Sequence, residues 1–133
     1  MKICITSMGD TLNSNVDPRF GRCKYFLIID TDSMDVRSVT NDSMIASGGA
    51  GIQAAQIVVK TGVGAVITGN IGPNAFQTLN AAGIKVITGV NGVIKDVVDM
   101  FNKDELKKIE TPTVGSHYGI GGTNRGFGSG GNL

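Results

Sequence analysis

The sequence predicts an α/β domain built on a five-stranded mixed sheet, with its elements in the order βββαβαβα and helices on both faces. Two patterns carry this prediction. The first forty residues contain short apolar segments separated by turn residues, which is typical of strands. From residue 48 onward, apolar segments of strand length alternate with segments of helical periodicity. This alternation predicts parallel βαβ units.

Three strands are expected in the N-terminal part. Lys2–Thr6 and Tyr25–Ile29 are short apolar segments, and Asp35–Val39 is a weaker one that follows the turn Asp30–Asp32. Because only this turn separates the last two strands, we expect them to form an antiparallel hairpin. The loop Ser7–Cys23 is long for a compact domain, and loops of that length are commonly functional.

Strands and helices alternate in the rest of the domain. A glycine-rich turn, Gly48–Gly51, opens the first expected helix, which ends near Gly62 and presents Ile52, Ala55 and Val59 on one face. The remaining expected elements are a strand at Ala65–Thr68, a helix with Ala75, Phe76, Leu79 and Ala82 capped by Gly83, a strand at Ile84–Thr88, and a helix with Ile94, Val97, Val98 and Phe101.

Length and composition limit the class of protein. The chain has 133 residues, of which 41% are hydrophobic, and a net charge of +1, so one domain can bury its own core. It lacks the basic excess of a nucleic-acid-binding protein, and no apolar segment reaches the roughly 18 residues of a membrane span. Its N-terminus does not resemble a signal peptide, and two cysteines are too few for a disulfide framework. We therefore expect a cytoplasmic protein that binds neither nucleic acid nor membrane.

Glycine is unevenly distributed along the chain. Eight of the 20 glycines lie in Gly115–Leu133, a segment whose only charged side chain is Arg125. Such a segment buries too little apolar surface to offset the entropy of ordering. Pro112 follows the charged segment Lys103–Glu110 and marks the boundary. We expect a domain at residues 1–110 and a flexible glycine-rich C-terminal tail at residues 111–133.

Three segments are expected to converge on one binding site. In sheets of this kind, ligands bind beyond the carboxyl ends of the parallel strands, beside helix N-termini. The loop Ser7–Cys23 and the turns Gly48–Gly51 and Gly69–Asn74 should meet there. Exposed N–H groups at helix N-termini suit a negatively charged ligand, although ordinary turn geometry also explains these glycines and asparagines.

The long loop contains the most varied chemistry. Arg19 and Arg22 offer two guanidinium groups for an anion. Arg22 is expected to lower the pKa of its neighbour Cys23, and a thiolate is a good ligand for a soft metal. The alternative is a surface loop with Phe20 folded inward and Cys23 as a core residue. His117, the chain's single histidine, is a weaker candidate ligand because it falls in the expected tail.

Catalytic arrangements are scarce. No common hydrolase or metalloprotease motif is present, and a single histidine argues against a Ser-His-Asp or Cys-His site. Asp10, Asp17 and Asp30 could gather at one end of the sheet and hold a divalent metal. A ribonuclease H-like, metal-dependent hydrolase therefore stays open as one alternative. The other is a metal-free module that binds a phosphorylated small molecule or a protein partner at the same helix N-termini.

Several segments resemble the dinitrogenase iron–molybdenum cofactor biosynthesis (NifX-like) proteins. The resemblance covers nearly all of residues 1–102 through Arg19-Phe20-Gly21-Arg22 with Tyr25-Phe26, Gly49-Ala50-Gly51, Gly69-Asn70-Ile71-Gly72-Pro73-Asn74-Ala75, and Leu79 followed by Ala82-Gly83-Ile84-Lys85-Val86. It implies a ribonuclease H-like α/β sandwich in a small stand-alone member. It also implies a non-enzymatic protein that binds or carries an iron–sulfur or iron–molybdenum cluster, or its precursor, and exchanges it with a cluster donor or acceptor protein.

The chain departs from the family pattern at two positions. Many cofactor-binding members have histidine just before Phe-Gly, where this chain has Arg19, which cannot ligate metal. Cys23 falls where a small residue is usual and is therefore a candidate replacement ligand. The residues expected to bind the cluster are Arg19, Phe20, Gly21, Arg22, Gly48, Gly49, Gly51, Asn70, Gly72 and Asn74, with Cys23 and His117 as candidate metal ligands.

Overall fold

The computed structural model describes residues 1–42 and 49–106. Gly48, His117 and the domain boundary expected at residue 110 lie outside the described residues. The elements are β1 (Lys2–Ser7), the short 3-10 helix η1 (Phe20–Arg22), β2 (Tyr25–Asp30), β3 (Val36–Thr40), α1 (Ala50–Val59), β4 (Ala65–Ile67), α2 (Pro73–Ala81), β5 (Lys85–Ile87) and α3 (Ile94–Asn102). Each strand boundary lies within one residue of the expected position.

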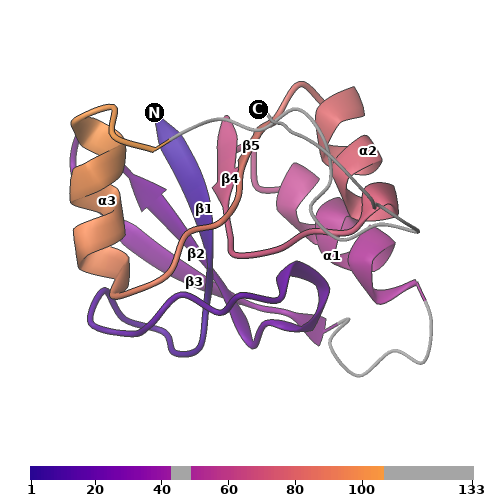
Figure 1. The fold of residues 1–133 in the computed structure, drawn as a ribbon, viewed down its shortest axis with the longest axis horizontal. Coiled ribbons are helices and arrows are strands. Elements are labelled where there is room, and N and C mark those ends of the chain that lie inside the picture. Colours follow the sequence, from indigo (N-terminus) through magenta and orange to yellow (C-terminus); the bar gives the residue numbers. More distant parts are fainter. Residues whose placement is uncertain (43–48, 107–133) are drawn as a thin grey trace.

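The strands form a single mixed sheet in the order β3-β2-β1-β4-β5 (Figure 1). β2 pairs antiparallel with both β1 and β3, and the β2–β3 pair confirms the predicted hairpin. β4 lies parallel to β1 and to β5, with Val66 opposite Cys4 and Val86. These pairings confirm the predicted mixed sheet, whereas its description as ribonuclease H-like stays a prediction.

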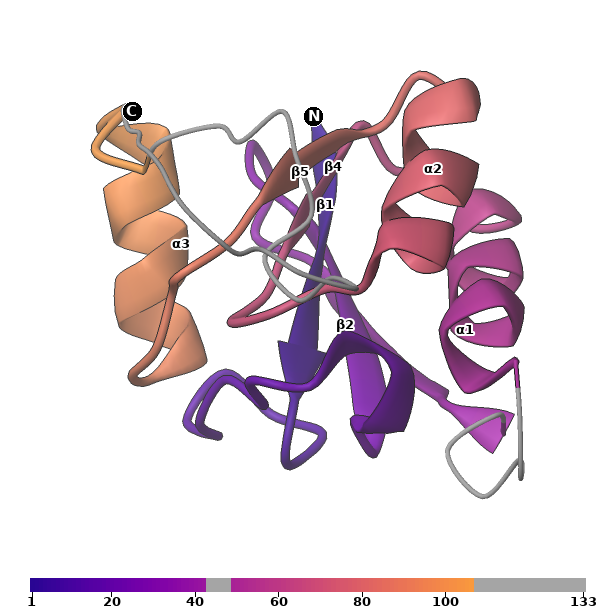
Figure 2. The ribbon, with the colours of Figure 1, turned by 45° about the vertical axis from the view of Figure 1, so that its right-hand side comes forward.

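Helices cover both faces of the sheet (Figure 2). Side chains alternate between the faces of a strand, so Cys4 of β1 packs in the apolar cluster beneath α1 and α2. Its neighbours Ile3 and Ile5 pack in the opposite cluster, beneath α3. The prediction of a two-faced α/β domain is therefore confirmed. No helix in the described ranges is long and apolar enough to cross a membrane.

The buried face of α1 differs from the expected one. Ile52 and Val59 are 36% and 37% exposed, so their assignment to a buried face was wrong. The residues that α1 buries are mostly small: Ala50, Ala54, Ala55 and Val58. Small side chains let α1 approach its neighbours closely; a Cβ on Gly51 would touch the Cβ of Ala75 in α2 at 3.4 Å. Close helix packing, rather than side-chain size, decides which face of α1 is buried.

The ends of α1 and α2 are formed largely as predicted. Gly62 and Gly83 follow the two helices with φ angles of 76° and 78°, the left-handed conformation that glycine adopts without steric cost. Ala82 is the exception, because it is the exposed C-cap of α2 rather than part of its buried face.

Candidate functional site

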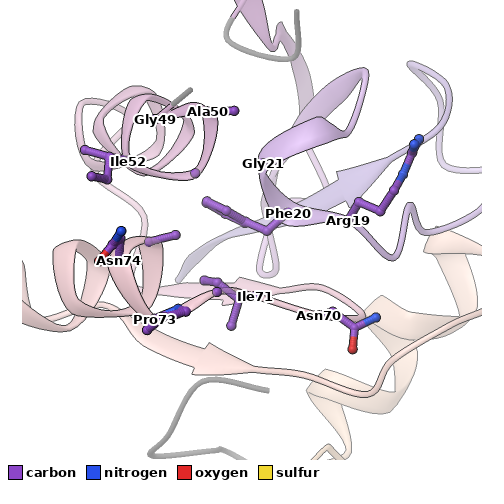
Figure 3. Close-up of a pocket in the computed structure, with 13 residues that line it drawn as sticks. Arg19, Phe20, Gly21, Gly49, Ala50, Ile52, Asn70, Ile71, Pro73 and Asn74 are labelled. Atoms are coloured by element: carbon purple, nitrogen blue, oxygen red, sulfur yellow. The ribbon is translucent and has the colours of Figure 1, made fainter. Parts of the chain in front are cut away.

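A cavity of about 470 Å³ opens where three chain segments meet (Figure 3). One wall comes from the loop between β1 and β2, one from the start of α1, and one from the turn between β4 and α2. Its lining residues are Arg19, Phe20, Gly21, Gly49, Ala50, Gly51, Ile52, Asn70, Ile71, Gly72, Pro73, Asn74 and Ala75. The long loop and the described parts of both glycine-bearing turns therefore converge in space, as expected from the sequence.

Two backbone hydrogen bonds join the long loop to the β4–α2 turn. The N–H of Asn70 donates to the carbonyl of Pro18 at 2.7 Å, and the N–H of Phe20 donates to the carbonyl of Asn70 at 3.2 Å. The two segments approach so closely that a Cβ on Gly69 would lie 2.6 Å from the Cα of Pro18. Glycine at position 69 is what allows this contact, which fixes one side of the cavity.

A second close approach joins the loop to α1. A Cβ on Gly21 would lie 3.1 Å from both the N and the Cα of Gly51. Phe20, which is 2% exposed, anchors the loop in the core with its ring centroid 5.7 Å from that of Phe26. The inward-folded Phe20 that the sequence allowed as an alternative is therefore observed, and its ring lies between the start of α1 and Ile71 of the β4–α2 turn (Figure 3).

Both α1 and α2 begin at the cavity with N–H groups available for a ligand. Their N-caps are Gly49 and Gly72, which have no side chain to cap the helix, and neither first turn contains an acidic residue. Pro73 lacks an N–H group, and within the described part of the chain no hydrogen bond occupies the N–H groups of Ala50, Gly51, Ile52, Asn74 and Ala75. Since a helix N-terminus carries partial positive charge, two of them at one cavity favour an anion.

Arg19 borders the cavity, but its guanidinium is bound to another group. Asp17, whose side chain is 3% exposed, accepts hydrogen bonds from the Arg19 N–H at 3.0 Å and from its Nε and Nη2 at 3.2 Å each. The hydrogen bond and charge of Asp17 raise the pKa of Arg19. In Figure 3 the side chain extends away from the first turns of α1 and α2. Arg22 is exposed and lies outside the cavity lining.

Cys23 lies in the core rather than in the cavity. It is fully buried, and its thiol donates to the carbonyl of Phe20 at 3.3 Å. Burial raises the pKa of Cys23 to about 12, the charge of Asp17 adds to this effect, and a hydrogen bond from Asn41 opposes it. The expectation that Arg22 lowers this pKa was therefore wrong, because adjacency in sequence does not place a guanidinium beside a buried sulfur.

The three aspartates that were candidates for a metal site do not come together. β2 runs antiparallel to β1, so Asp30 lies opposite Lys2 at the start of β1, whereas Asp10 follows the end of β1. The carboxylate of Asp30 accepts a hydrogen bond from the N–H of Asp32 at 2.9 Å and so stabilises the turn between β2 and β3. Across residues 1–42 and 49–106, no three histidine, cysteine, aspartate or glutamate side chains are grouped to hold a metal ion.

The sequence analysis missed part of the apolar lining of the cavity. Phe20 was proposed as a site residue and Ile71 lies in the predicted turn Gly69–Asn74, but the side chains of Ile52, Ile71 and Ala75, which also line the cavity, were not proposed. The available signal was the position of Ile52 and Ala75 in the first turns of their helices, next to the glycines that were selected. These side chains give the cavity an apolar wall beside its N–H donors.

Comparison with known proteins adds independent information. A family model described as dinitrogenase iron-molybdenum cofactor matches residues 1–104. The chain is similar to the apo form of the orange protein from Desulfovibrio gigas, with 40% identity, a TM-score of 0.82, and coverage of 85% of this chain and 96% of that one. A proposed NifB protein from Thermotoga shows 38% identity, a TM-score of 0.74, and coverage of 85% and 97%. An uncharacterised protein of Methanocaldococcus jannaschii is 29% identical over 101 residues, 74% of this chain and 86% of that protein.

Proposed function

Because the chain belongs to the dinitrogenase iron-molybdenum cofactor family, we propose that it binds an anionic metal–sulfur cluster, or a precursor of one, and carries it without catalysing a reaction. The cargo is an iron–sulfur or iron–molybdenum cluster, exchanged with a donor or acceptor protein. The related orange protein is described in its apo form, the term for a protein without its bound group, and this supports a binding role.

The convergence on one cavity of two helix N-termini whose N-cap residues are glycines, with no side chain to cap the helix, is the observation that carries the proposal. Its volume of about 470 Å³ lies within the roughly 300–1,000 Å³ of small-ligand sites. Sulfide ligands of a cluster accept hydrogen bonds. The N–H groups at the starts of α1 and α2, which no hydrogen bond between described residues occupies, are placed to donate them. The apolar wall formed by Ile52, Ile71 and Ala75 suits an anion whose charge is spread over many atoms.

The described lining supports binding without coordination. None of the described cavity residues is a cysteine, histidine, aspartate or glutamate. A cluster held by hydrogen bonds and helix dipoles is released without breaking a metal–ligand bond, which suits a carrier. Cys23 is protonated at neutral pH because its pKa is about 12, so it would have to become exposed and lose its proton before it could ligate.

A charge placed at the start of α2 tests the proposal. Asn74→Asp adds a carboxylate to the first turn of α2, at the cavity. This change favours the helix by about 0.3–1 kcal/mol but repels an anion, so we expect at least tenfold weaker binding with no loss of stability. Asn80→Asp makes the same change near the other end of α2, on an exposed residue outside the cavity lining, and serves as the control.

The assay is anaerobic incubation with tetrathiomolybdate, or with iron and sulfide, followed by desalting, metal analysis and visible spectroscopy. We expect stoichiometric metal in the wild type and in Asn80→Asp, and loss in Asn74→Asp. Equal metal uptake by both variants would show that the cluster does not bind at this cavity. Cys23→Ser should keep the wild-type spectrum, whereas a changed spectrum would make Cys23 a ligand. His117→Ala tests the remaining sequence prediction in the same way.

The same lining also favours a second candidate, a metal-free site for a phosphorylated small molecule. The N–H groups at the starts of α1 and α2 suit phosphate as well as sulfide. A ligand that binds only the native state raises its melting temperature. Under the carrier proposal, tetrathiomolybdate raises the melting temperature and sugar or nucleoside phosphates do not; the reverse result would favour the second candidate.

A further inference from the structure

The ion pair between Asp17 and Arg19 suggests how the anion affinity of the cavity is set. Arg19 borders the cavity, yet its guanidinium is held by Asp17 and points away from the helix N-termini (Figure 3). We propose that Asp17 lowers the affinity of the cavity for anions by holding the Arg19 guanidinium outside it. This inference rests on the proposed function, since the cargo is the anion that competes with Asp17 for Arg19.

Asp17 is fixed in place by the ends of two central strands. Its N–H donates to the carbonyl of Thr6 at 2.9 Å, and its carbonyl accepts a hydrogen bond from the Thr6 hydroxyl at 2.7 Å. The single hydroxyl proton of Thr6 is used in that bond, so the Thr68 hydroxyl, 2.8 Å away, donates to Thr6. All three residues are buried. These bonds hold the Asp17 backbone, and its side chain is only 3% exposed, so the carboxylate has little room to follow Arg19 if the guanidinium moves.

Arg19 combines a fixed backbone with a side chain that is free to turn. Its backbone forms a parallel bridge with Asn70 at the cavity rim, and its N–H is held by Asp17. The side chain is 65% exposed, so little packing opposes rotation about its own torsions. The contacts with the Asp17 carboxylate are what decide between the observed position and one that faces the cavity.

The ion pair has a direct electrostatic consequence. While Asp17 and Arg19 are paired their charges cancel, and the cavity attracts anions mainly through the N-termini of α1 and α2. A released guanidinium within about 6 Å of the anion would strengthen binding by on the order of tenfold, at an effective dielectric constant between those of protein and water. Moderate affinity suits a carrier that must give up its cargo.

The test is a double-mutant cycle with two anion probes, tetrathiomolybdate and inorganic phosphate, measured by calorimetry at low and high salt. Asp17→Asn removes the charge that holds the guanidinium, so we expect about tenfold tighter binding at low salt and a steeper salt dependence. Arg19→Gln alone leaves the Asp17 carboxylate unpaired, so it should weaken anion binding severalfold at low salt. The double variant should return to the wild-type affinity, because its only unpaired charge is gone.

A measurement on the wild-type protein tests the same inference without the risk that a substitution damages the fold. The Nε–H nuclear magnetic resonance signal of Arg19 in the wild type should stay in place during titration with tetrathiomolybdate, because the guanidinium remains on Asp17. A shift of that signal to a new position at saturation would overturn the inference. So would an unchanged affinity in Asp17→Asn, or a double variant that keeps the tighter binding of Asp17→Asn.

The two proposals fail in different ways. If the wild type takes up tetrathiomolybdate and Asn74→Asp weakens it, but the Asp17 and Arg19 variants show no coupling, only the inference fails. If Asp17→Asn gains affinity for phosphate while no variant binds tetrathiomolybdate, the proposed cargo is wrong and the role of Asp17 stands. If no variant binds either probe, both fail.

Discussion

Replacement of Gly69 by alanine should open the contact between the long loop and the β4–α2 turn. A Cβ at this position would lie 2.6 Å from the Cα of Pro18, 2.8 Å from its Cβ and 3.0 Å from its carbonyl oxygen. Ordinary carbon contacts are about 3.5–4.0 Å, so one backbone segment must move. Gly69 is not among the glycines with positive φ, so the expected cost comes from the contact itself.

The expected cost follows from the contacts that this movement disturbs. Overpacking against backbone costs about 1–3 kcal/mol, and weakening the 2.7 Å hydrogen bond from Asn70 to Pro18 costs about 1 kcal/mol. Alanine offsets about 0.4–1 kcal/mol of this cost because it restricts the conformations of the unfolded chain. The net loss in the free energy of unfolding should be about 1–3.5 kcal/mol, equivalent to a fall of roughly 5–25 °C in melting temperature for a domain of this size.

Urea unfolding at constant m value measures this loss, and Gly64→Ala is the matched control. A Cβ on Gly64 would meet the Cε of Met1 at 2.7 Å, but this is the end of a flexible side chain that is 46% exposed. We expect Gly64→Ala to be neutral or slightly stabilising. Unfolding free energies of the two variants within about 0.5 kcal/mol of each other would refute the reasoning.

Three further predictions follow from buried and hydrogen-bonded groups. Burial raises the pKa of Cys23 to about 12, so its contribution to stability is complete below the pKa of an exposed thiol and is lost as pH rises from about 9 to about 12. Cys23→Ala should therefore reduce the fall of unfolding free energy in that window by about 1.4 kcal/mol per pH unit. Thr6→Val should cost about 1–3 kcal/mol in urea unfolding because it leaves the buried carbonyl of Asp17 without its donor, whereas Thr68→Val should cost about 1 kcal/mol. Hydrogen bonds from backbone N–H groups lower the pKa of Asp30. Its contribution to the free energy of unfolding is therefore present above about pH 4 and is lost as pH falls through the lowered pKa. Asp30→Asn should weaken the acid dependence of the melting temperature.

Each of these predictions has a clear opposing result. A Cys23→Ala variant as sensitive to alkali as the wild type would show that this thiol does not stay protonated in the native state. A Thr68→Val variant that costs more than Thr6→Val would contradict the assigned direction of the two hydroxyl hydrogen bonds. An unchanged acid dependence in Asp30→Asn would mean that the turn contributes nothing through this carboxylate.

The order of the elements could be predicted because it depends on local patterns. Periodicity of apolar residues, and glycine at the helix ends, are properties of neighbours in the chain, and they located every strand within one residue. The convergence of the long loop with the two turns was also predictable. Parallel strands and their crossover helices place these segments at one edge of the sheet.

The chemistry of individual site residues depended on contacts between distant segments. The buried face of α1 is chosen by its approach to α2, so Ile52 is exposed while Ala54 and Ala55 are buried. The pKa of Cys23 is set by burial in the core rather than by its neighbour in sequence. Asp17 is positioned by Thr6 of β1, and through Thr6 by Thr68 after β4.

By itself, the sequence determined the succession of strands and helices and the glycines that begin the helices at the cavity, because these follow from backbone preferences and local periodicity. Only the tertiary structure decided that Arg19 is paired with Asp17 and that Asp10 and Asp30 belong to opposite ends of the sheet. A side chain's charge state and direction depend on groups brought close by folding, and a single sequence does not record those distances.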